Sequence, residues 1–233
     1  MLKIDGLEAY YGESHILHNV DFQMAGGERV SVLGRNGAGK STFLKSIMHV
    51  GVKTKGMMSF DGRDLAGIAD YKRARLGMAM VPEDRRIFSH LSVIENLTIA
   101  RYAAGERECL DLGDIMACFP MLEALSSRYG NQLSGGQQQV LAVARGIYPR
   151  PRILLLDEPT EGVAPVIVQQ MAKSINEICG KYGIALLLCE QNIWFARTCT
   201  HRVCVIDSGH FVFDGSWAEF DADSSIRDRY LAV

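Results

Sequence analysis

The chain has 233 residues, of which 48% are hydrophobic and 22% are charged, and its formal net charge is −2 at pH 7. Such a composition is typical of a globular protein of one large or two small domains, and the small net charge favours neither a nucleic-acid partner nor general affinity for anionic membranes. No apolar run approaches the roughly 18 residues that span a bilayer, no secretory signal opens the chain, and the 6 cysteines include no C-x-x-C pair. We therefore expect a cytoplasmic protein with reduced thiols and no zinc site.

The N-terminal residues show strand patterns. Residues 2–9 and 15–24 alternate weakly between apolar and polar side chains, and 28–33 is a short apolar run. We expect an N-terminal antiparallel β subdomain followed by a buried strand. Tyr11 lies between the first two strands, where it can be an ordinary turn residue or a platform on which a nucleotide base stacks.

A glycine-rich loop follows the strand at 28–33. The sequence GRNGAGKS at 34–41 has the form G-x-x-x-x-G-K-S and precedes apolar residues at helical spacing. Its glycines let backbone N–H groups approach a polyphosphate, and the helix N-terminus adds partial positive charge. A glycine turn can also precede a helix by chance, but the full pattern favours a nucleoside triphosphate site. The residues predicted to bind it are Gly34, Arg35, Asn36, Gly37, Ala38, Gly39, Lys40, Ser41 and Thr42, with Ser41 also a Mg²⁺ ligand.

The middle of the chain changes from strand to helix patterns. After a strand at 78–81, residues 92–127 show helical periodicity broken by Gly105, Gly113 and Pro120, and no strand signal appears until Ile153. We interpret 1–233 as one domain with subdomains. Its predicted parts are a nucleotide-binding core at 1–85 and 150–233 and an inserted α-helical subdomain at about 86–149.

Residues 133–139, LSGGQQQ, open a further helix in this segment. Ser134 can cap the helix, and the helix N-terminus with its two glycines forms a second anion site. One chain needs only one phosphate pocket, so we predict that this site serves a nucleotide across a dimer interface. The residues involved are Ser134, Gly135, Gly136 and Gln137.

Two acids end a continuous aliphatic strand at 153–156. Ligands bind α/β sheets at the carboxyl ends of strands, so we predict that Asp157 holds Mg²⁺ and that Glu158 is the general base for the attacking water. Two acids can also simply end a strand, and the glycine-rich loop in the same chain favours the functional interpretation. Alternating helices and strands follow and predict a mainly parallel sheet covered on both faces: helices at 165–180, 192–199 and 225–231, and strands at 184–189, 203–207 and 210–213.

The motifs GRNGAGKS, LSGGQ and ILLLDE, in this order, resemble the ATP-binding subunit of an ABC transporter over essentially the whole chain. The resemblance implies an α/β P-loop NTPase (RecA-like) core. It also implies a head-to-tail dimer in which ATP lies between the P-loop of one subunit and LSGGQ of the other. By the same match, Tyr11 stacks on adenine, and residues 160–165 form the D-loop that touches the opposite active site.

Two positions depart from the commonest family pattern. Glu83 stands where the loop after the strand usually carries Gln, and Gln191 stands where the switch position usually carries His. We expect Glu83 to face Mg²⁺ or the lytic water. We expect Gln191 to position the γ-phosphate and the water without relaying a proton, although Gln191 can instead cap the helix at 192–199.

The segments VPEDRRIF, TEGVAP and CEQN resemble the second ATPase subunit of branched-chain amino-acid importers, a group with urea and amide relatives. This likeness implies a second ABC ATPase subunit in a hetero- or homodimer, two integral membrane permease subunits and an extracytoplasmic solute-binding protein. The chain would then lie on the inner face of the cell membrane. The loop from Glu83 to Phe88 is the candidate docking site for the permeases, and an ordinary solvated loop is the alternative.

Other P-loop proteins remain as rivals. A small-molecule kinase or a GTPase would not explain LSGGQ, and the chain has no N-K-x-D motif for guanine. A soluble ABC protein that acts on ribosomes or DNA usually has two cassettes or long coiled coils. A regulatory subunit without hydrolysis would not need Lys40, Asp157 and Glu158 together.

Overall fold

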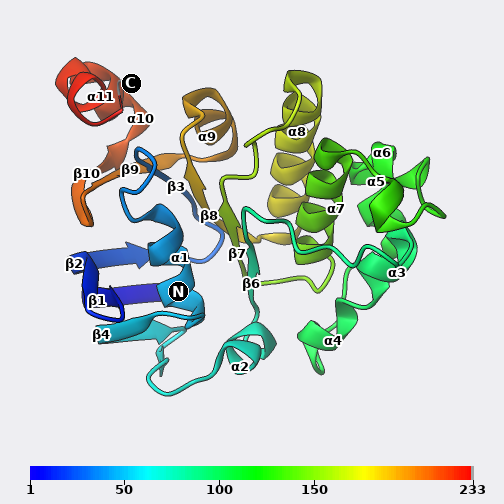
Figure 1. Cartoon of the computed structure of the whole chain (residues 1–233), viewed down its shortest axis with the longest axis horizontal. Coiled ribbons are helices and arrows are strands. Elements are labelled where there is room, and N and C mark those ends of the chain that lie inside the picture. Colours follow the sequence, from blue (N-terminus) through cyan, green and yellow to red (C-terminus); the bar gives the residue numbers. More distant parts are fainter. Residues whose placement is uncertain (232–233) are drawn as a thin grey trace.

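The computed structural model describes residues 1–231, whose strands form two sheets (Figure 1). A four-stranded antiparallel sheet has the order β2-β1-β4-β5, and a six-stranded sheet has the order β10-β9-β3-β8-β7-β6. In the second sheet only the edge pair β9–β10 is antiparallel. The strands are β1 (Leu2–Tyr11), β2 (Ser14–Met24), β3 (Arg29–Leu33), β4 (Lys53–Phe60), β5 (Arg63–Asp64), β6 (Met78–Val81), β7 (Ile153–Asp157), β8 (Ala185–Glu190), β9 (Arg202–Asp207) and β10 (His210–Ser216).

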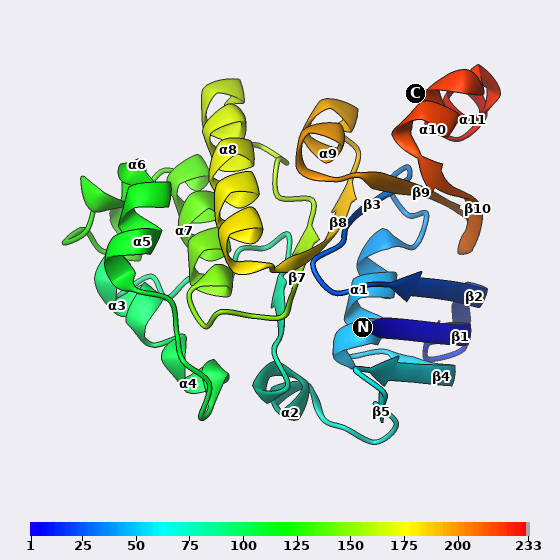
Figure 2. The same cartoon turned by 180° about the vertical axis from the view of Figure 1, so that it is seen from behind.

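The helices cover both faces of the six-stranded sheet and build one end of the molecule (Figure 2). None of the helices within residues 1–231 combines the length and the apolar character that crossing a bilayer requires. The helices are α1 (Lys40–Met48), α2 (Asp70–Arg75), α3 (Val93–Thr98), α4 (Arg101–Ala104), α5 (Leu112–Cys118), α6 (Pro120–Glu123), the 3₁₀ helix η1 (Gly130–Gln132), α7 (Gly135–Ile147), α8 (Pro165–Tyr182), α9 (Ile193–Cys199), α10 (Trp217–Ala222) and α11 (Ser224–Tyr230).

The six-stranded sheet is buried on both faces because its side chains alternate between two apolar clusters. In β7, Leu154 and Leu156 pack with α7 and α8, whereas Ile153 and Leu155 pack with α1 and the antiparallel sheet. Successive side chains of a strand point to opposite faces, so a continuous aliphatic run fits only a strand between two layers. The predicted mainly parallel α/β sheet is confirmed.

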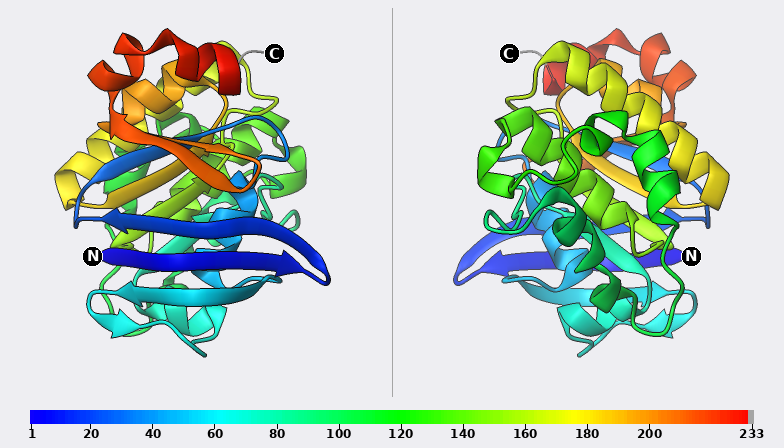
Figure 3. Two further views of the ribbon diagram at one scale, coloured as in Figure 1. Left: turned by 90° about the vertical axis from the view of Figure 1, so that its left-hand side faces the viewer. Right: turned by 90° about the vertical axis from the view of Figure 1, so that its right-hand side faces the viewer.

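The antiparallel sheet packs on α1, on the far side of that helix from the parallel sheet (Figure 1), and its strands occupy the lower half of both views in Figure 3. Its strand β4 begins at Lys53, three residues before Gly56. Gly56 has φ +96°, and a Cβ there would lie 2.3 Å from the carbonyl oxygen of Gly6, so only glycine permits this close pairing of β4 with β1. The pairing register between β1 and β4 shifts at this point.

The segment between β6 and β7 is helical, but its helices are short. Gly105 caps the end of α4 and Pro120 opens α6, as expected of breakers. The expected break at Gly113 is wrong, because Gly113 lies in the first turn of α5, where its N–H donates to the Asp111 carboxylate. Helix α10 was also not predicted, although the capping box of Ser216 and Glu219 marks its start.

Candidate functional site

The carboxyl ends of β3, β7 and β8 bring the predicted catalytic residues together. These strands are neighbours in the sheet, with Leu33 paired to Glu190 and Asp157 paired to Cys189. The P-loop leaves β3 at this edge and runs directly into α1. Residues far apart in the sequence therefore meet at one end of the sheet, as ligand-binding residues do in open α/β folds.

Lys40 is folded back into the P-loop. Its ammonium donates to the carbonyl oxygens of Gly34 (2.6 Å) and Arg35 (2.9 Å) and forms an ion pair with Glu158 Oε1 (3.0 Å). The Lys40 side chain is only 3% exposed. A phosphate that Lys40 contacts must compete with these acceptors.

The P-loop glycines have different surroundings. A Cβ at Gly34 would lie 2.5 Å from the Ile206 carbonyl oxygen, and one at Gly39 would lie 2.9 Å from Leu17 Cδ2, so these two allow the loop to pack against β9 and β2. Gly37 has φ +80° and open space where a Cβ would be. The loop thus offers an exposed stretch at 35–37, whereas Ala38, Gly39 and Thr42 are buried.

Ser41 and Asp157 form a polar contact at the base of the loop. The Ser41 hydroxyl donates to Asp157 Oδ1 at 3.0 Å. Burial raises the pKa of Asp157 to about 6, the negative charges of Glu158 and Glu83 add to this, and the Ser41 hydrogen bond opposes it. Within residues 1–231, no three His, Cys, Asp or Glu side chains are grouped to hold a metal. Two oxygen ligands from the chain suit Mg²⁺, which in phosphate-binding sites takes few protein ligands and completes its shell with phosphate and water oxygens.

Glu158 adopts a rare backbone conformation. Its φ of +44° lies in the left-handed region, its side chain is 9% exposed, and its N–H donates to the Cys189 carbonyl. Strained non-glycine residues of this kind cluster at functional sites. The turn directs the carboxylate to Lys40 on one oxygen and to Gln191 on the other.

Gln191 bridges the P-loop and Glu158. Its Nε2 donates to Asn36 Oδ1 and to Glu158 Oε2, each at 2.7 Å. Asn192, not Gln191, caps α9, because its side chain accepts from the Phe195 N–H at 3.1 Å. The alternative prediction that Gln191 caps this helix is therefore wrong.

Two further acids face this site from neighbouring loops. Glu83 is exposed in the loop after β6, and its charge helps to raise the pKa of Asp157. Glu161, which sequence analysis did not select, has a raised pKa caused by burial, by hydrogen bonding with Glu158 and by the charge of Glu83. Its position three residues after Glu158 is the sequence feature that could have indicated that Glu161 lies near the site.

The LSGGQ segment forms a well-capped helix start. Ser134 Oγ accepts from the Gln137 N–H (3.3 Å), and Gln137 Oε1 accepts from the Ser134 N–H (2.9 Å). A Cβ at Gly135 would meet Arg85 and one at Gly136 would meet Ile167, each at 2.8 Å. Figure 1 shows α7 and α1 on opposite sides of β7 and β8, so LSGGQ and the P-loop do not adjoin within one chain.

Tyr11 ends β1 at the hairpin, and its side chain is 39% exposed. It pairs with Ser14 at the start of β2. Leu17, further along β2, borders Gly39 of the P-loop. Tyr11 therefore lies at the end of a strand pair whose second strand contacts the P-loop, and its ring is accessible to solvent.

Comparison with known proteins agrees with this arrangement. The ABC transporter family model matches residues 17–161. The chain is 34% identical over 232 residues, 99% of both proteins, to the high-affinity branched-chain amino acid transport ATP-binding protein BraG of Pseudomonas aeruginosa. It is also 34% identical over 217 residues, 93% of this chain and 92% of the relative, to the probable branched-chain amino acid transport ATP-binding protein LivF of Archaeoglobus fulgidus.

Solved structures share the fold. The ATP-binding subunit of an ABC transporter aligns with a TM-score of 0.80 at 25% identity, covering 99% of this chain and 96% of that one. The bacterial ABC transporter cassette MJ0796, solved as a dimer, aligns with a TM-score of 0.79 at 24% identity, covering 93% and 98%. The chain therefore belongs to the ABC transporter family and is similar over nearly its whole length to the ATP-binding subunits of branched-chain amino-acid transporters.

Proposed function

We propose that this chain is the ATP-hydrolysing subunit of an importer for branched-chain or other hydrophobic amino acids. It would act in a dimer with a second ABC ATPase subunit, on the inner face of the membrane beneath two permease subunits that receive solute from an extracytoplasmic binding protein. The observation that carries the ATPase is the contact of Lys40 and Gln191 with the two oxygens of Glu158. The names of BraG and LivF support the solute class.

The chemistry follows from these contacts. When the γ-phosphate binds the Lys40 ammonium, the ion pair between Lys40 and Glu158 is broken. Glu158 Oε1 is then free to accept a proton from water. Gln191 holds the other oxygen of Glu158 and can direct its amide toward the phosphate or the water. ATP binding would thus release the base that hydrolyses ATP.

Ser41 and Asp157 would hold Mg²⁺, with Glu83 facing the same site from the loop after β6. The metal supplies charge neutralisation at the β- and γ-phosphate oxygens. Ionised Asp157 is buried at a cost in free energy, which a bound divalent cation would offset.

The second nucleotide contact would come from the partner subunit. LSGGQ and the P-loop lie apart within this chain (Figure 1), so the helix start at Ser134 is open to a nucleotide held by another P-loop. The related cassette MJ0796 has been solved as a dimer. Either a second copy of this chain or a different ATPase subunit would complete the pair.

A groove beside the loop at 83–88 would receive a cytoplasmic helix of a permease subunit. It has a volume of about 400 Å³ and lies between α1, α2 and β6 of the core and helices α4 and α7. Its lining is largely apolar, and the positive charges of Lys45, Arg86 and Arg145 at it outnumber the negative charge of Asp70. We therefore expect an apolar helix with acidic residues as the occupant.

Transport in reconstituted vesicles tests this function. The chain, its partner ATPase and the permeases are purified together, and uptake of labelled leucine, isoleucine and valine is compared with uptake of urea and acetamide. ATP-dependent uptake of the amino acids, abolished by Lys40→Ala, is expected. Uptake of urea or acetamide without uptake of the amino acids would contradict the proposed amino-acid solutes and indicate a urea or amide importer. Failure of any permease to co-purify would favour a soluble ABC ATPase.

A further inference from the structure

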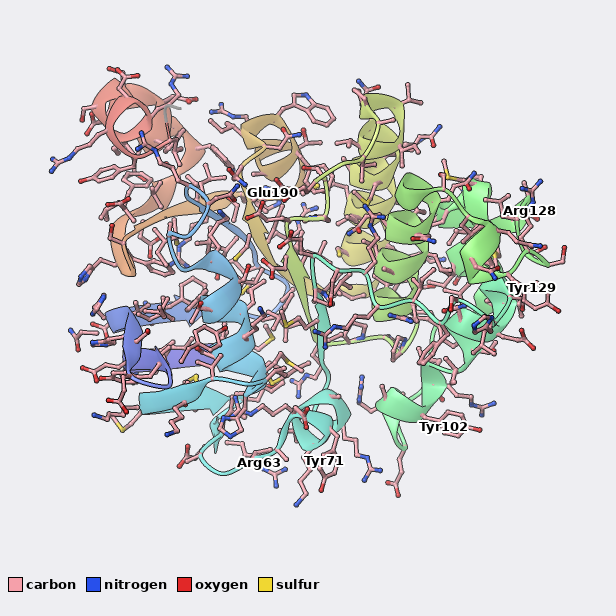
Figure 4. The ribbon with its side chains drawn as sticks, viewed as in Figure 1. Arg63, Tyr71, Tyr102, Arg128, Tyr129 and Glu190 are labelled. Atoms are coloured by element: carbon pink, nitrogen blue, oxygen red, sulfur yellow. The ribbon has the colours of Figure 1, made fainter. Side chains whose placement is uncertain are left out.

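Glu190, the last residue of β8, is a buried carboxylate that backbone N–H groups surround. Its side chain lies next to the start of α9 (Figure 4) and is 2% exposed. Oε1 accepts from the Thr160 N–H at 3.0 Å, and Oε2 accepts from the N–H groups of Gln191 and Asn192, each at 3.0 Å. One side chain thus joins the loop after β7 to the loop after β8.

Both of these loops carry residues of the ATP site. Thr160 begins the loop at 160–165 and lies two residues after Glu158, while the Gln191 side chain contacts Glu158 and Asn36. The backbone of Gln191 is therefore fixed by the same carboxylate that fixes the start of the 160–165 loop. A small shift of this loop would move Gln191 relative to Glu158.

A carboxylate such as that of Glu190 is well suited to hold both loops. A buried carboxylate is costly unless its acceptor sites are filled, and here backbone donors from two loops fill both oxygens. Burial raises the pKa of Glu190, whereas these N–H donors lower it. A neutral amide of the same size would place an NH₂ group against one set of donors, so only a carboxylate serves both loops.

We propose that Glu190 is a positioning residue for ATP hydrolysis, which couples the 160–165 loop to Gln191. The inference rests on the proposed ATPase function and adds a connection that the chemistry above does not use. In a dimer, a partner that displaces the 160–165 loop would change, through Glu190, how Gln191 holds Glu158 and therefore when hydrolysis occurs.

The test compares Glu190→Gln and Glu190→Asp with wild type in the assembled complex. The Gln variant loses one set of acceptors, and the Asp variant keeps the charge but is too short to reach both loops. We expect the kcat of each to fall by about 3- to 10-fold, no more than removal of the Gln191 side chain itself should cost, because Glu190 acts by positioning Gln191. The equilibrium Kd for ATP should stay within about twofold, since neither variant alters a phosphate contact.

A double-mutant cycle separates positioning from general destabilisation. If Glu190 acts through Gln191, then Glu190→Gln in a Gln191→Ala background should lower kcat by less than about twofold further. The control is Thr200→Val, which removes a buried hydroxyl bonded to Ser31 Oγ and the Ala196 carbonyl at the other end of α9. It should lower the melting temperature and leave kcat unchanged.

Two results would overturn the inference. One is wild-type kcat in both Glu190 variants. The other is a fold-loss of kcat from Glu190→Gln that is as large in the Gln191→Ala background as in the wild type. Should Glu190→Gln fail to fold, Glu190→Asp carries the test. A wild-type complex that does not hydrolyse ATP would contradict the proposed function as well. An active wild-type complex whose two Glu190 variants hydrolyse ATP at the wild-type rate would contradict the coupling alone.

Discussion

Lys40 Nζ lies 3.0 Å from Glu158 Oε1, so the cation expected to bind phosphate and the carboxylate expected to activate water neutralise each other. Both side chains are almost fully buried, at 3% and 9% exposure. A buried pair is destabilising to break unless a new partner replaces the lost one. A phosphate that binds Lys40 would therefore free the Glu158 carboxylate from this ion pair.

Lys40→Ala should abolish ATP binding or weaken it strongly. The substitution removes the ammonium that contacts the P-loop carbonyls of Gly34 and Arg35, and it leaves Glu158 buried without its cation. An equilibrium titration with a fluorescent ATP analogue measures the effect, with exposed Lys55→Ala as the charge-matched control. Unchanged affinity in Lys40→Ala would contradict the assignment of the P-loop.

Glu158→Gln should lower the ATPase rate by about 10²- to 10⁴-fold, the usual contribution of a general base. ATP should still bind, because the variant keeps the shape of the side chain and frees Lys40 from its carboxylate. A closed dimer should then accumulate with ATP and Mg²⁺ and elute at higher mass in size-exclusion chromatography. Glu106→Gln, at an exposed acid between α4 and α5, serves as the acidic control. Wild-type turnover in Glu158→Gln would mean that the base lies elsewhere.

Gln191→Ala should slow hydrolysis less than Glu158→Gln does. It removes neutral hydrogen-bond donation to Glu158 and Asn36, and a lost hydrogen bond costs about 0.5–1.5 kcal/mol, or about 2- to 13-fold in rate. Turnover is compared in the assembled complex, since a partner subunit can contribute its own site. A loss as deep as that of Glu158→Gln, with ATP binding intact, would show that the switch position is essential to the chemistry.

Asp157 should make the metal-free protein less stable as the pH rises. Burial raises the pKa of Asp157 from 3.8 to about 6, so the folded state holds a proton between about pH 4 and pH 6 that the unfolded state has lost. The stability that this proton provides is complete below about pH 4 and is lost as the pH passes 6.

Asp157→Asn removes this dependence and keeps an acceptor for Ser41. In EDTA at pH 7 the variant should be more stable than wild type by up to about 3 kcal/mol, with the difference vanishing near pH 4. Urea denaturation across this pH range provides the measurement. A variant that follows the wild-type pH profile would show that Asp157 titrates normally.

Phe88→Ala should uncouple hydrolysis from transport. The Phe88 ring is 48% exposed and lies 5.2 Å from the Arg145 guanidinium, which lines the groove proposed for a permease helix. Solute uptake by reconstituted vesicles should fall while basal ATPase activity remains. Met57→Ala, which removes an exposed apolar side chain from β4, is the control. Wild-type uptake in Phe88→Ala would exclude this docking site.

The sequence alone determined the features that depend on neighbouring residues. A strand, a glycine loop and a helix within 28–48 predict a phosphate site, because backbone N–H groups and a helix dipole act locally. The continuous aliphatic runs before Asp157 and Gln191 likewise predicted buried strands that end at a ligand site. Capping is local too, which is why the sequence could indicate the helix start at Ser134.

The tertiary structure decided every contact between distant residues. The ion pair of Lys40 with Glu158 and the bridge of Gln191 to Asn36 require β3, β8 and β7 to lie side by side, an order that no local pattern specifies. No pattern in the sequence distinguishes Glu190 from the other acidic residues, and only the fold buries it between two loops. Such contacts depend on strand order and packing, and these are set by burial across the whole chain rather than by any short segment.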